Sequence, residues 1–248
     1  MIAKNQSRTI KPDFSAGEVI LIDKDAGLTS FKIVHKIRKA VGVKKVGHAG
    51  TLDPAATGLL IVCSGKKTKE ISHYQGLTKT YSGIIALGKR TSSMDGESEV
   101  IEEKDFTGIT EEQILEAANS FIGTIQQIPP MFSALKHKGK PLYEYARKGV
   151  EIERQPREVT IYRFAVTSVE LPDVRFEVDC SKGTYIRVLA DDLGNKLGCG
   201  AYLKYLRREK IGEFDVKDGY RISEFENLFG SSNSDKKLIE KKDDENIC

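Results

Sequence analysis

The sequence lacks long hydrophobic runs and closely spaced cysteines, and each absence argues against a class of protein. No stretch approaches the roughly 18 apolar residues that a membrane span needs, and the polar residues 1–8 lack the apolar core of a secretory signal. The few cysteines form no pair at metal-ligand spacing: Cys63, Cys180, Cys199 and Cys248. We therefore expect a cytoplasmic protein with reduced thiols, and neither a zinc site nor a disulfide framework.

One stretch predicts a tight loop that presents a carboxylate. Residues 47–58 (GHAGTLDPAATG) hold three glycines and a proline, which disfavour both a helix and a regular strand. Asp53 stands directly before Pro54, which biases its backbone towards extended conformations. Taken alone, such a pair is more often a structural turn whose carboxylate accepts nearby backbone amides. The rest of the chain decides between that turn and a functional site.

Net charge is also small, at +3, but the positive charges are concentrated in two segments. Residues 24–45 contain seven Lys or Arg against a single Asp, and residues 131–163 contain eight against four Glu. A solvated helix face explains either segment alone. Two such segments around one carboxylate loop suit a polyphosphate and favour RNA or DNA as the partner.

Hydrophobic patterning predicts alternating strands and helices along most of the chain. The expected strands are 17–23, 58–63, 79–87, 123–127, 158–170, 174–180 and 201–208. Ser30 is expected to be the N-cap of the first helix, and later helices are expected to begin at a Thr110 capping box, at Pro141 and at Tyr185. Residues 88–98 are polar, flanked by glycine and without periodicity, so we expect a surface loop there.

The helix that begins at Ser30 is expected to carry both a core stripe and a basic face. Three- and four-residue spacing predicts that its core side chains are Phe31, Val34, Ile37 and Val41. Its outward residues are then Lys32, Lys36 and Lys39, with His35 among them on the surface. A similar stripe is expected in the helix after Thr110, formed by Ile114, Leu115, Ala118, Phe121 and Ile122.

Two further features do not fit a simple core. Residues 128–154 begin with Ile-Pro-Pro, are basic and weakly apolar, and suit either an insertion that folds onto a partner or a solvated excursion. Arg187 falls in the first turn of the helix that begins at Tyr185. A helix dipole disfavours a cation at that end, so we expect a partner carboxylate for Arg187.

Several short motifs now fall into a known order and spacing. They are residues 47–58, 79–81 (KTY), 183–187 (GTYIR) and 205–208 (YLRR), with 128–134 (IPPMFSA) and 143–147 (YEYAR) in the insertion. Together they resemble the TruB family of tRNA pseudouridine synthases, over about residues 17–208. The loop at 47–58 is the most specific of them, whereas each shorter motif alone would be weak evidence.

The resemblance implies a fold, an activity and a partner. The fold is α+β, with a mixed, largely antiparallel central sheet flanked by helices (the pseudouridine synthase fold) and a thumb insertion at about residues 128–154. The activity is isomerisation of uridine to pseudouridine at position 55 in the T loop of tRNA, by base flipping, with no cofactor and no metal. The expected partner is the T stem-loop of tRNA. We expect the protein to be a monomer and to have no membrane partner.

The resemblance also assigns catalytic roles. Asp53 is the nucleophile, and it must stay ionised beneath a flipped base although burial alone would raise the pKa of its carboxyl. Arg187 is the fixed cation that opposes this rise, with a geometry that Lys could not reproduce. Tyr81 lies under the base, where its ring can stack and its hydroxyl can relay a proton.

Three more residues are assigned to substrate binding. By resemblance, His48 enters the T loop and fills the space that the flipped base leaves, for which a planar imidazole is suited. Tyr185 and Leu206 close the pocket around the uracil, although ordinary core packing is the alternative for both. The two basic segments then bind phosphates on either side of the T loop.

The resemblance has two departures. The family typically has Lys-Pro-x-Gly before the first helix, whereas this chain has Lys24-Asp25-Ala26-Gly27, so that turn loses a proline constraint. Many members also carry a C-terminal PUA domain. We expect a catalytic domain over residues 14–222, a polar and disordered tail over 223–248, and no PUA domain.

Two other functions remain open from the sequence. The same cleft and basic surfaces would serve a module that binds or refolds tRNA without chemistry, either instead of the isomerisation or in addition to it. A hydrolytic carboxylate enzyme such as a glycosidase is less favoured, because no second acidic residue sits in a comparable motif.

Overall fold

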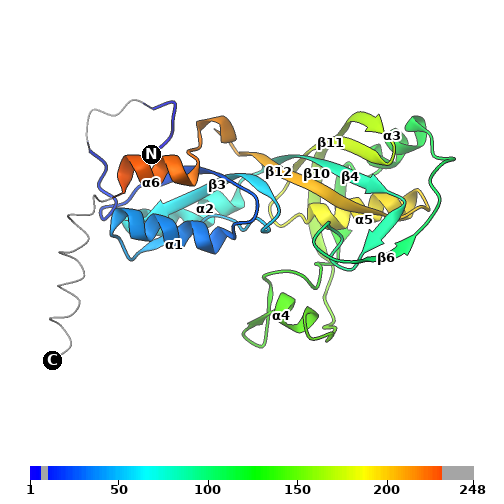
Figure 1. Ribbon diagram of the computed structural model, residues 1–248, viewed down its shortest axis with the longest axis horizontal. Coiled ribbons are helices and arrows are strands. Elements are labelled where there is room, and N and C mark those ends of the chain that lie inside the picture. Colours follow the sequence, from blue (N-terminus) through cyan, green and yellow to red (C-terminus); the bar gives the residue numbers. More distant parts are fainter. Residues whose placement is uncertain (7–10, 231–248) are drawn as a thin grey trace. The chain divides into compact units, whose positions relative to one another are not determined.

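Residues 1–6 and 11–230 are described by this computed structural model, and they divide into two units (Figure 1). Unit 1 comprises the described residues of Met1–Gly76 and of Lys210–Cys248, and unit 2 comprises Leu77–Glu209. Each unit has its own strands, helices and buried residues. No helix of the described residues is both long and apolar enough to cross a bilayer.

Unit 1 is built on two strands that are buried almost along their whole length. β1 (Val19–Lys24) pairs antiparallel with β3 (Thr57–Ser64), with Ile20 opposite Val62. Every residue of β1 is buried, as is every residue of β3 except Thr57. Burial on both faces explains the continuous apolar runs at residues 19–22 of β1 and 59–63 of β3, and β1 ends in the buried polar pair Asp23 and Lys24. The short strand β2 (Val46–His48) also pairs antiparallel with β3.

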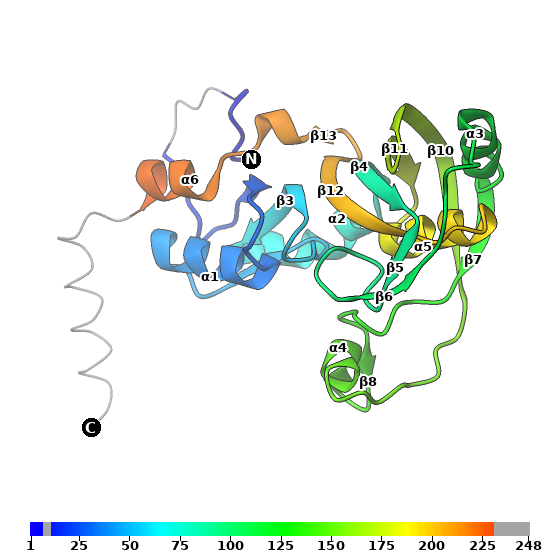
Figure 2. The same cartoon turned by 45° about the vertical axis from the view of Figure 1, so that its right-hand side comes forward.

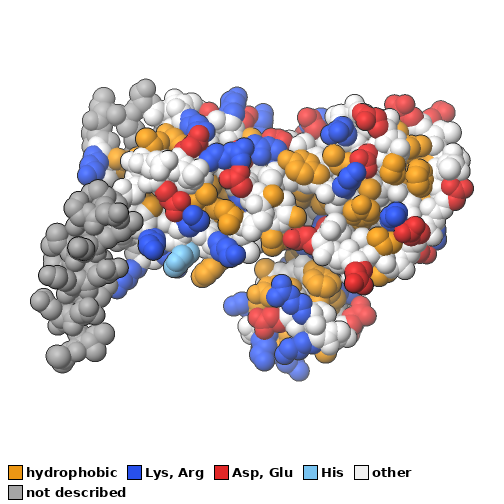
Figure 3. Space-filling model, viewed as in Figure 1, with side chains coloured by type: hydrophobic (Ala, Val, Ile, Leu, Met, Phe, Trp, Pro, Cys, Tyr) orange, Lys and Arg blue, Asp and Glu red, His pale blue; other side chains and the backbone are white. Residues whose placement is uncertain are grey.

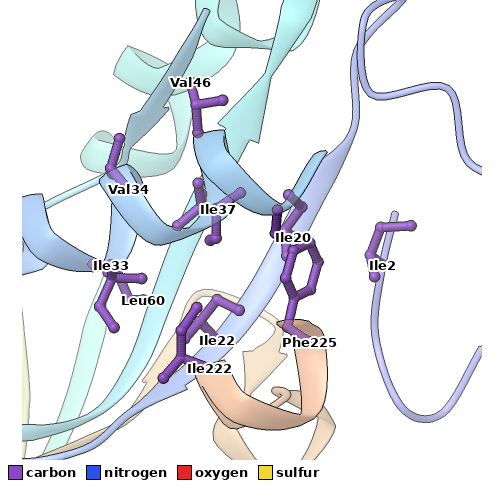
Figure 4. Packing of buried hydrophobic residues seen from close by; sticks show 12 residues of the cluster. Ile2, Ile20, Ile22, Ile33, Val34, Ile37, Val46, Leu60, Ile222 and Phe225 are labelled. Carbon is purple, nitrogen blue, oxygen red and sulfur yellow. The ribbon is translucent and has the colours of Figure 1, made fainter. Parts of the chain in front are cut away.

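Two helices cover one face of these strands. α1 (Ser30–Val41) and α6 (Ile222–Phe229) pack against each other and share one hydrophobic core with β1 and β3. Figure 4 shows this packing, in which side chains from all four elements meet: Ile20, Ile22, Ile33, Ile37, Leu60 and Phe225. The rest of unit 1 consists of η1 (Gly65–Glu70), α2 (Ile71–Gly76), β13 (Phe214–Asp215) and η2 (Val216–Asp218).

The structure corrects two predictions for α1. Its N-cap is Thr29, whose hydroxyl accepts from the Lys32 amide at 3.1 Å, and Ser30 is the first helical residue. Phe31, predicted to face the core, is 67% exposed. The buried stripe starts at Ile33, and two residues are about 200° of helical turn, so Phe31 lies on the opposite face.

Unit 2 contains a largely antiparallel sheet with the strand order β12-β4-β11-β10-β7. These strands are β12 (Ala201–Ile211), β4 (Lys79–Leu87), β11 (Asp173–Cys180), β10 (Arg157–Glu170) and β7 (Gly123–Gln127). In β4 and β11 buried residues alternate with partly exposed ones over most of each strand, as expected for strands with one core face.

Two helices of unit 2 contact each other, and one of them packs on the sheet. α3 (Glu111–Asn119) contacts both β10 and α5 (Ile186–Lys196). The predicted capping box is present, since the Thr110 hydroxyl accepts from the Gln113 amide and the Gln113 side chain accepts from the Thr110 amide. Leu115 and Ile122, predicted to belong to the core stripe, are 39% and 48% exposed. Ile122 lies beyond the end of α3, whose buried face is formed by Ile114, Ala117 and Ala118.

The predicted surface loop at 88–98 is only partly a loop. Near its start, β5 (Lys89–Thr91) pairs antiparallel with β6 (Val100–Glu103), which begins two residues after the end of the segment. Its centre lies against the main sheet of the same unit, because Asp95 forms a bridge with Leu203 of β12. Polar composition hid this contact, which is made by the backbone.

The insertion after β7 has its own small structure. It contains a two-residue hairpin, β8 (Lys136–His137) with β9 (Lys140–Pro141), followed by α4 (Leu142–Ala146). Figures 1 and 2 both show this segment standing away from the sheet of unit 2. Within α4, the buried residue is Leu142.

The α+β prediction with a largely antiparallel sheet is confirmed, and the predicted tail needs a correction. The pairs β1 with β3, β10 with β11, β10 with β7 and β11 with β4 are antiparallel, and isolated bridges such as Ile2 with Ile20 are parallel. Residues 223–229 were expected in a polar tail, but they form most of α6, whose Phe225 is fully buried. Ile222, Phe225 and Phe229 recur at three- and four-residue spacing, and they pack the helix against the core of unit 1. The remainder, 231–248, lies outside the described residues.

A half-buried carboxylate in α5, that of Asp192, gives a prediction for stability. Burial, and then the neighbouring Asp191, raise the pKa of Asp192 from 3.8 to about 6. Its stabilising contribution is therefore present below pH 4 and is lost as pH rises through 6. At pH 7 we expect Asp192→Asn to raise the free energy of unfolding by about 1–2 kcal/mol, after allowance for solvent screening.

Urea denaturation from pH 4 to 8 measures this difference. The gain should grow between pH 4 and 6 and vanish at pH 4. Asp105→Asn, at an exposed carboxyl whose pKa is lowered by bonds from Thr107, is the matched control and should show no gain. A difference independent of pH for Asp192→Asn would contradict the assignment.

Candidate active site

The loop that carries Asp53 is a wide connection between two paired strands. It leaves β2 after His48 and enters β3, and the Ala49 amide still donates to Ile61 O at 2.8 Å. Gly50 then turns with a φ of 105°, a conformation that side chains other than glycine rarely adopt. Asp53 follows, half-buried, and its carbonyl accepts from the Ala56 amide at 3.2 Å. The chain therefore turns at Asp53.

A serine of α1 holds the residue before Asp53. The Ser30 hydroxyl accepts from the Leu52 amide at 2.9 Å and contacts the Leu52 carbonyl at 3.2 Å. Leu52 itself is buried. These contacts fix the backbone next to Asp53 to the first turn of the helix in the same unit.

A buried lysine holds the residue after Asp53. Lys24 is fully buried at the end of β1, and its ammonium donates to the carbonyls of Asp25 at 3.0 Å, Leu28 at 2.7 Å and Pro54 at 3.1 Å. Burying an ammonium is costly unless its three donors find acceptors, and here all three do. Lys24 was counted in the basic segment at 24–45, and the structure removes it from any surface that could bind phosphate.

The missing proline at residue 25 is compensated in the structure. Asp25 forms an ion pair with Arg221, and the Gly27 amide donates to Pro54 O at 2.9 Å. The turn before α1 is thus tied to the Asp53 loop by two donors on one carbonyl, that of Pro54. His48 is half-buried at the end of β2, five residues before Asp53 and in the same unit.

In unit 2, Arg187 is buried and has three polar contacts. It is 5% exposed, and it donates to the carbonyls of Ser93 at 3.1 Å and Phe132 at 2.9 Å. Its Nε lies 3.5 Å from Asp95 Oδ2. The expectation that an arginine in the first turn of a helix has a carboxylate partner is confirmed, and within unit 2 that partner is Asp95. The pairing of Arg187 with Asp53 remains a prediction.

Asp95 is a site residue that the sequence alone did not reveal. It is 9% exposed, and its Oδ1 accepts from the Ser93 hydroxyl and the Glu97 amide. Met94, which precedes it, has a φ of 62°, an uncommon conformation for a residue other than glycine. An acidic residue in a polar loop carries no periodic signal, and its partner is far away in the sequence. Only the tertiary structure brings the two together.

Arg187 and Gln127 connect the start of α5 to neighbouring segments of unit 2. Phe132 belongs to the insertion, so Arg187 fixes the base of the insertion to α5. Tyr185 is the N-cap of α5, and the side chain of Gln127 brackets its backbone, accepting from its amide at 3.0 Å and donating to its carbonyl at 3.3 Å. Gln127 is almost fully buried. The start of α5 is therefore held on both sides.

Tyr81 and Leu206 lie on neighbouring strands of unit 2. Tyr81 is 8% exposed on β4, opposite Val178, and Leu206 is half-buried on β12. Lys79 shares the buried face of β4 with Tyr81. Burial, followed by the charge of the buried Arg208, lowers the pKa of Lys79 to about 8. Two buried cations, Lys79 and Arg208, are therefore close enough in unit 2 for one to disfavour the charge of the other.

The six predicted residues therefore fall into two sets. Unit 1 holds Asp53 and His48 in one loop, and unit 2 holds the other four on β4, α5 and β12: Tyr81, Tyr185, Arg187 and Leu206. Their catalytic and binding roles remain predictions. Among the residues that the structure describes, no group of three or more His, Cys, Asp or Glu could hold a metal ion.

The contact between Arg187 and Asp95 gives a prediction for stability. Asp95→Asn removes the charge partner of a buried guanidinium, so we expect the free energy of unfolding to fall by about 1–3 kcal/mol. Glu177→Gln is the matched control, because it weakens the exposed pair with Arg163 and should cost less than about 1 kcal/mol. Urea denaturation measures both. Equal, small losses would show that Asp95 does not stabilise Arg187.

Comparison with known proteins places this chain. Residues 38–186 match the model of the TruB family pseudouridylate synthase (N terminal domain), and residues 187–241 match the tRNA pseudouridylate synthase B C-terminal domain. The protein named tRNA pseudouridine synthase B from Chloroherpeton thalassium is 51% identical, covering 84% of this chain and 88% of its own length. The protein of the same name from Endomicrobium trichonymphae is 50% identical, covering 83% and 90%.

Solved structures agree with the sequence comparisons. A crystal structure of a Cbf5-Nop10-Gar1 complex matches with a TM-score of 0.64 at 29% identity, covering 86% of this chain and 58% of that one. The structure of an H/ACA RNP bound to a substrate RNA matches with a TM-score of 0.60 at 28% identity, covering 82% and 49%. Two consecutive family models match this chain, and it aligns with most of the length of relatives that are about half identical to it. The chain therefore belongs to the TruB family of pseudouridylate synthases.

Proposed function

We propose that this protein isomerises uridine to pseudouridine at position 55 in the T loop of tRNA, with Asp53 as the nucleophile. The observation that carries the proposal is the Asp53 loop itself, held by Ser30 on one side and Lys24 on the other. About half of all aligned residues are identical to proteins named tRNA pseudouridine synthase B, which supports tRNA as the substrate.

The reaction needs a nucleophile and no external reagent. The bond between N1 of the base and C1′ of the sugar breaks, and a bond between C5 and C1′ forms. One proton leaves C5 and N1 gains one, so that the mass of the RNA is unchanged. A carboxylate can form the covalent intermediate that keeps the base in the site while it rotates. Because the backbones of Leu52 and Pro54 are both held by hydrogen bonds, Asp53 loses little conformational entropy when the substrate binds.

The other predicted residues divide the remaining tasks. Arg187 supplies the fixed positive charge that keeps the nucleophile ionised, and Asp95 and two carbonyls orient its guanidinium. Tyr81 supplies a ring for stacking under the uracil and a hydroxyl for proton relay. Tyr185 and Leu206 close the pocket, and His48 occupies the space in the T loop that the extruded base leaves.

Two basic surfaces are proposed to bind the phosphates of the substrate. In unit 1 the exposed lysines of the first basic segment are Lys32, Lys39, Lys44 and Lys45. In the insertion they are Lys136, Lys138, Lys140 and Lys148, together with Arg147. Figure 3 shows blue side chains over both α1 and the segment around α4. Phosphate contacts of this kind position the RNA, and the pocket then selects the base.

The central test is replacement of the nucleophile. We expect Asp53→Asn to abolish conversion, because an amide cannot attack, and to leave tRNA affinity within a few-fold. Incubation with an unmodified T stem-loop, followed by nuclease digestion and chromatography of the nucleosides, measures conversion without a change in mass. Asp13→Asn, at an exposed carboxylate that caps Ser15 and Ala16, is the matched control.

Each outcome selects one function. Full conversion by Asp53→Asn would contradict the mechanism. Binding and refolding of tRNA by a wild-type protein that converts no uridine would identify the RNA-folding module instead. Release of free uracil would indicate hydrolysis, which the absence of a second acidic motif disfavours.

Electrostatic binding predicts a dependence on salt. We expect tRNA affinity to fall at least about tenfold between 50 and 200 mM salt, because phosphate contacts release counterions. The double variant Lys138→Gln with Lys140→Gln should reduce the slope of log affinity against log salt by about 2. Lys217→Gln, at an exposed lysine outside both surfaces, should leave the slope unchanged. Affinity that does not respond to salt would overturn the proposed phosphate surfaces.

A further inference from the structure

The outer face of α1 presents two ring side chains that its core stripe does not use. Phe31 is 67% exposed, the highest value of any large hydrophobic side chain in the described part of the chain. His35 is also exposed and lies four residues later. Residues four apart are neighbours on one face of a helix, so the two rings form one short strip. Figure 3 shows a histidine among lysines and arginines over α1.

This strip is surrounded by positive charge. α1 contains five basic or titratable side chains, Lys32, His35, Lys36, Arg38 and Lys39, and no acidic residue. Lys36 pairs with Glu226 at 3.1 Å, and Arg38 donates to Val46 O at 2.6 Å, so both are engaged within unit 1. Lys32 and Lys39 are exposed and form no ion pair with any residue that the structure describes. Lys32 lies beside Phe31, and Lys39 lies one turn beyond His35 on the same face.

These neighbours distinguish between possible partners. A protein partner or a second copy of the chain would need a contiguous apolar patch with few lysines at its centre. Here the residues next to Phe31 on the exposed face are lysine and histidine. An exposed ring with cations on both sides suits an unpaired nucleotide, whose base can stack and whose phosphates are anionic.

The strip is also attached to the candidate active site within unit 1. Phe31 follows Ser30, whose hydroxyl holds Leu52, and Leu52 precedes Asp53. Consecutive Cα atoms are about 3.8 Å apart. Phe31 is therefore the immediate neighbour of Ser30, and Asp53 is the immediate neighbour of Leu52, so the contact between Ser30 and Leu52 joins the two sites. An RNA that places a nucleotide at Asp53 must therefore pass near the start of α1.

We propose that Phe31 and His35 form a stacking platform for an unpaired base of the RNA substrate outside the catalytic pocket, with Lys32 and Lys39 binding its flanking phosphates. The platform rests on the proposed function, because it takes the same RNA. It adds a second point of base contact, which positions the substrate without taking part in the chemistry.

Binding of two RNAs tests the platform, a T stem-loop and a full-length unmodified tRNA, at one salt concentration. We expect Phe31→Ala to weaken binding of at least one of them by about fivefold or more. Phe31→Tyr keeps the ring and should stay within about twofold of wild type. Phe31→Leu keeps apolar bulk without the ring and should resemble Phe31→Ala. His35→Ala should weaken binding less, because the smaller ring offers less stacking area.

Two controls separate the platform from other effects. Leu228→Ala removes an equally exposed apolar side chain from α6 of the same unit and should bind both RNAs like wild type. Thermal melting should show that Phe31→Ala is folded, as expected for an exposed residue. Lys39→Gln should reduce the salt slope of binding by about 1.

The result that overturns the platform is distinct from failure of the proposed function. If wild-type protein converts uridine and Phe31→Ala binds both RNAs within twofold of it, no base stacks there. Wild-type affinity for Phe31→Leu would likewise exclude stacking. If the wild-type protein converts no uridine, the proposed function fails, and the same binding measurements still decide whether α1 carries a platform for RNA.

Discussion

A buried ammonium group determines where the Asp53 loop lies. Lys24 bonds three carbonyls from the end of β1, the turn before α1 and the loop after Asp53. Because an unpaired ammonium at that depth would be costly, these three segments must come together for unit 1 to fold. A loop with three glycines would otherwise have high conformational entropy. The cost of ordering it is met by folding, before any substrate is present.

Unit 2 uses a second buried cation in a similar way. Arg187 connects α5, the loop at Asp95 and the base of the insertion at Phe132. A planar guanidinium can bond in several directions at once, so one side chain orders three segments. In unit 1 the buried cation Lys24 holds the loop of Asp53, and in unit 2 the buried cation is Arg187, itself a residue proposed for the reaction. This arrangement links the integrity of the proposed site to the stability of its own unit.

Fewer positive charges are exposed at the surface of unit 1 than the composition of residues 24–45 suggests. Of the seven basic residues between 24 and 45, Lys24, Lys36 and Arg38 have partners inside unit 1. Those that remain are exposed lysines around two rings on α1 and at the start of β2. Burial therefore divides one basic segment into cations that hold unit 1 together and lysines that are exposed to solvent.

The sequence by itself determined the elements and the family. Strands such as 79–87, the capping box at Thr110 and the motif around Asp53 are local patterns, and local patterns need no knowledge of distant residues. Tertiary structure alone decided the role of Asp95, the burial of Lys24 and the exposure of Phe31. Each depends on which remote segment packs against the residue, and apolar spacing cannot identify a partner that lies elsewhere in the chain.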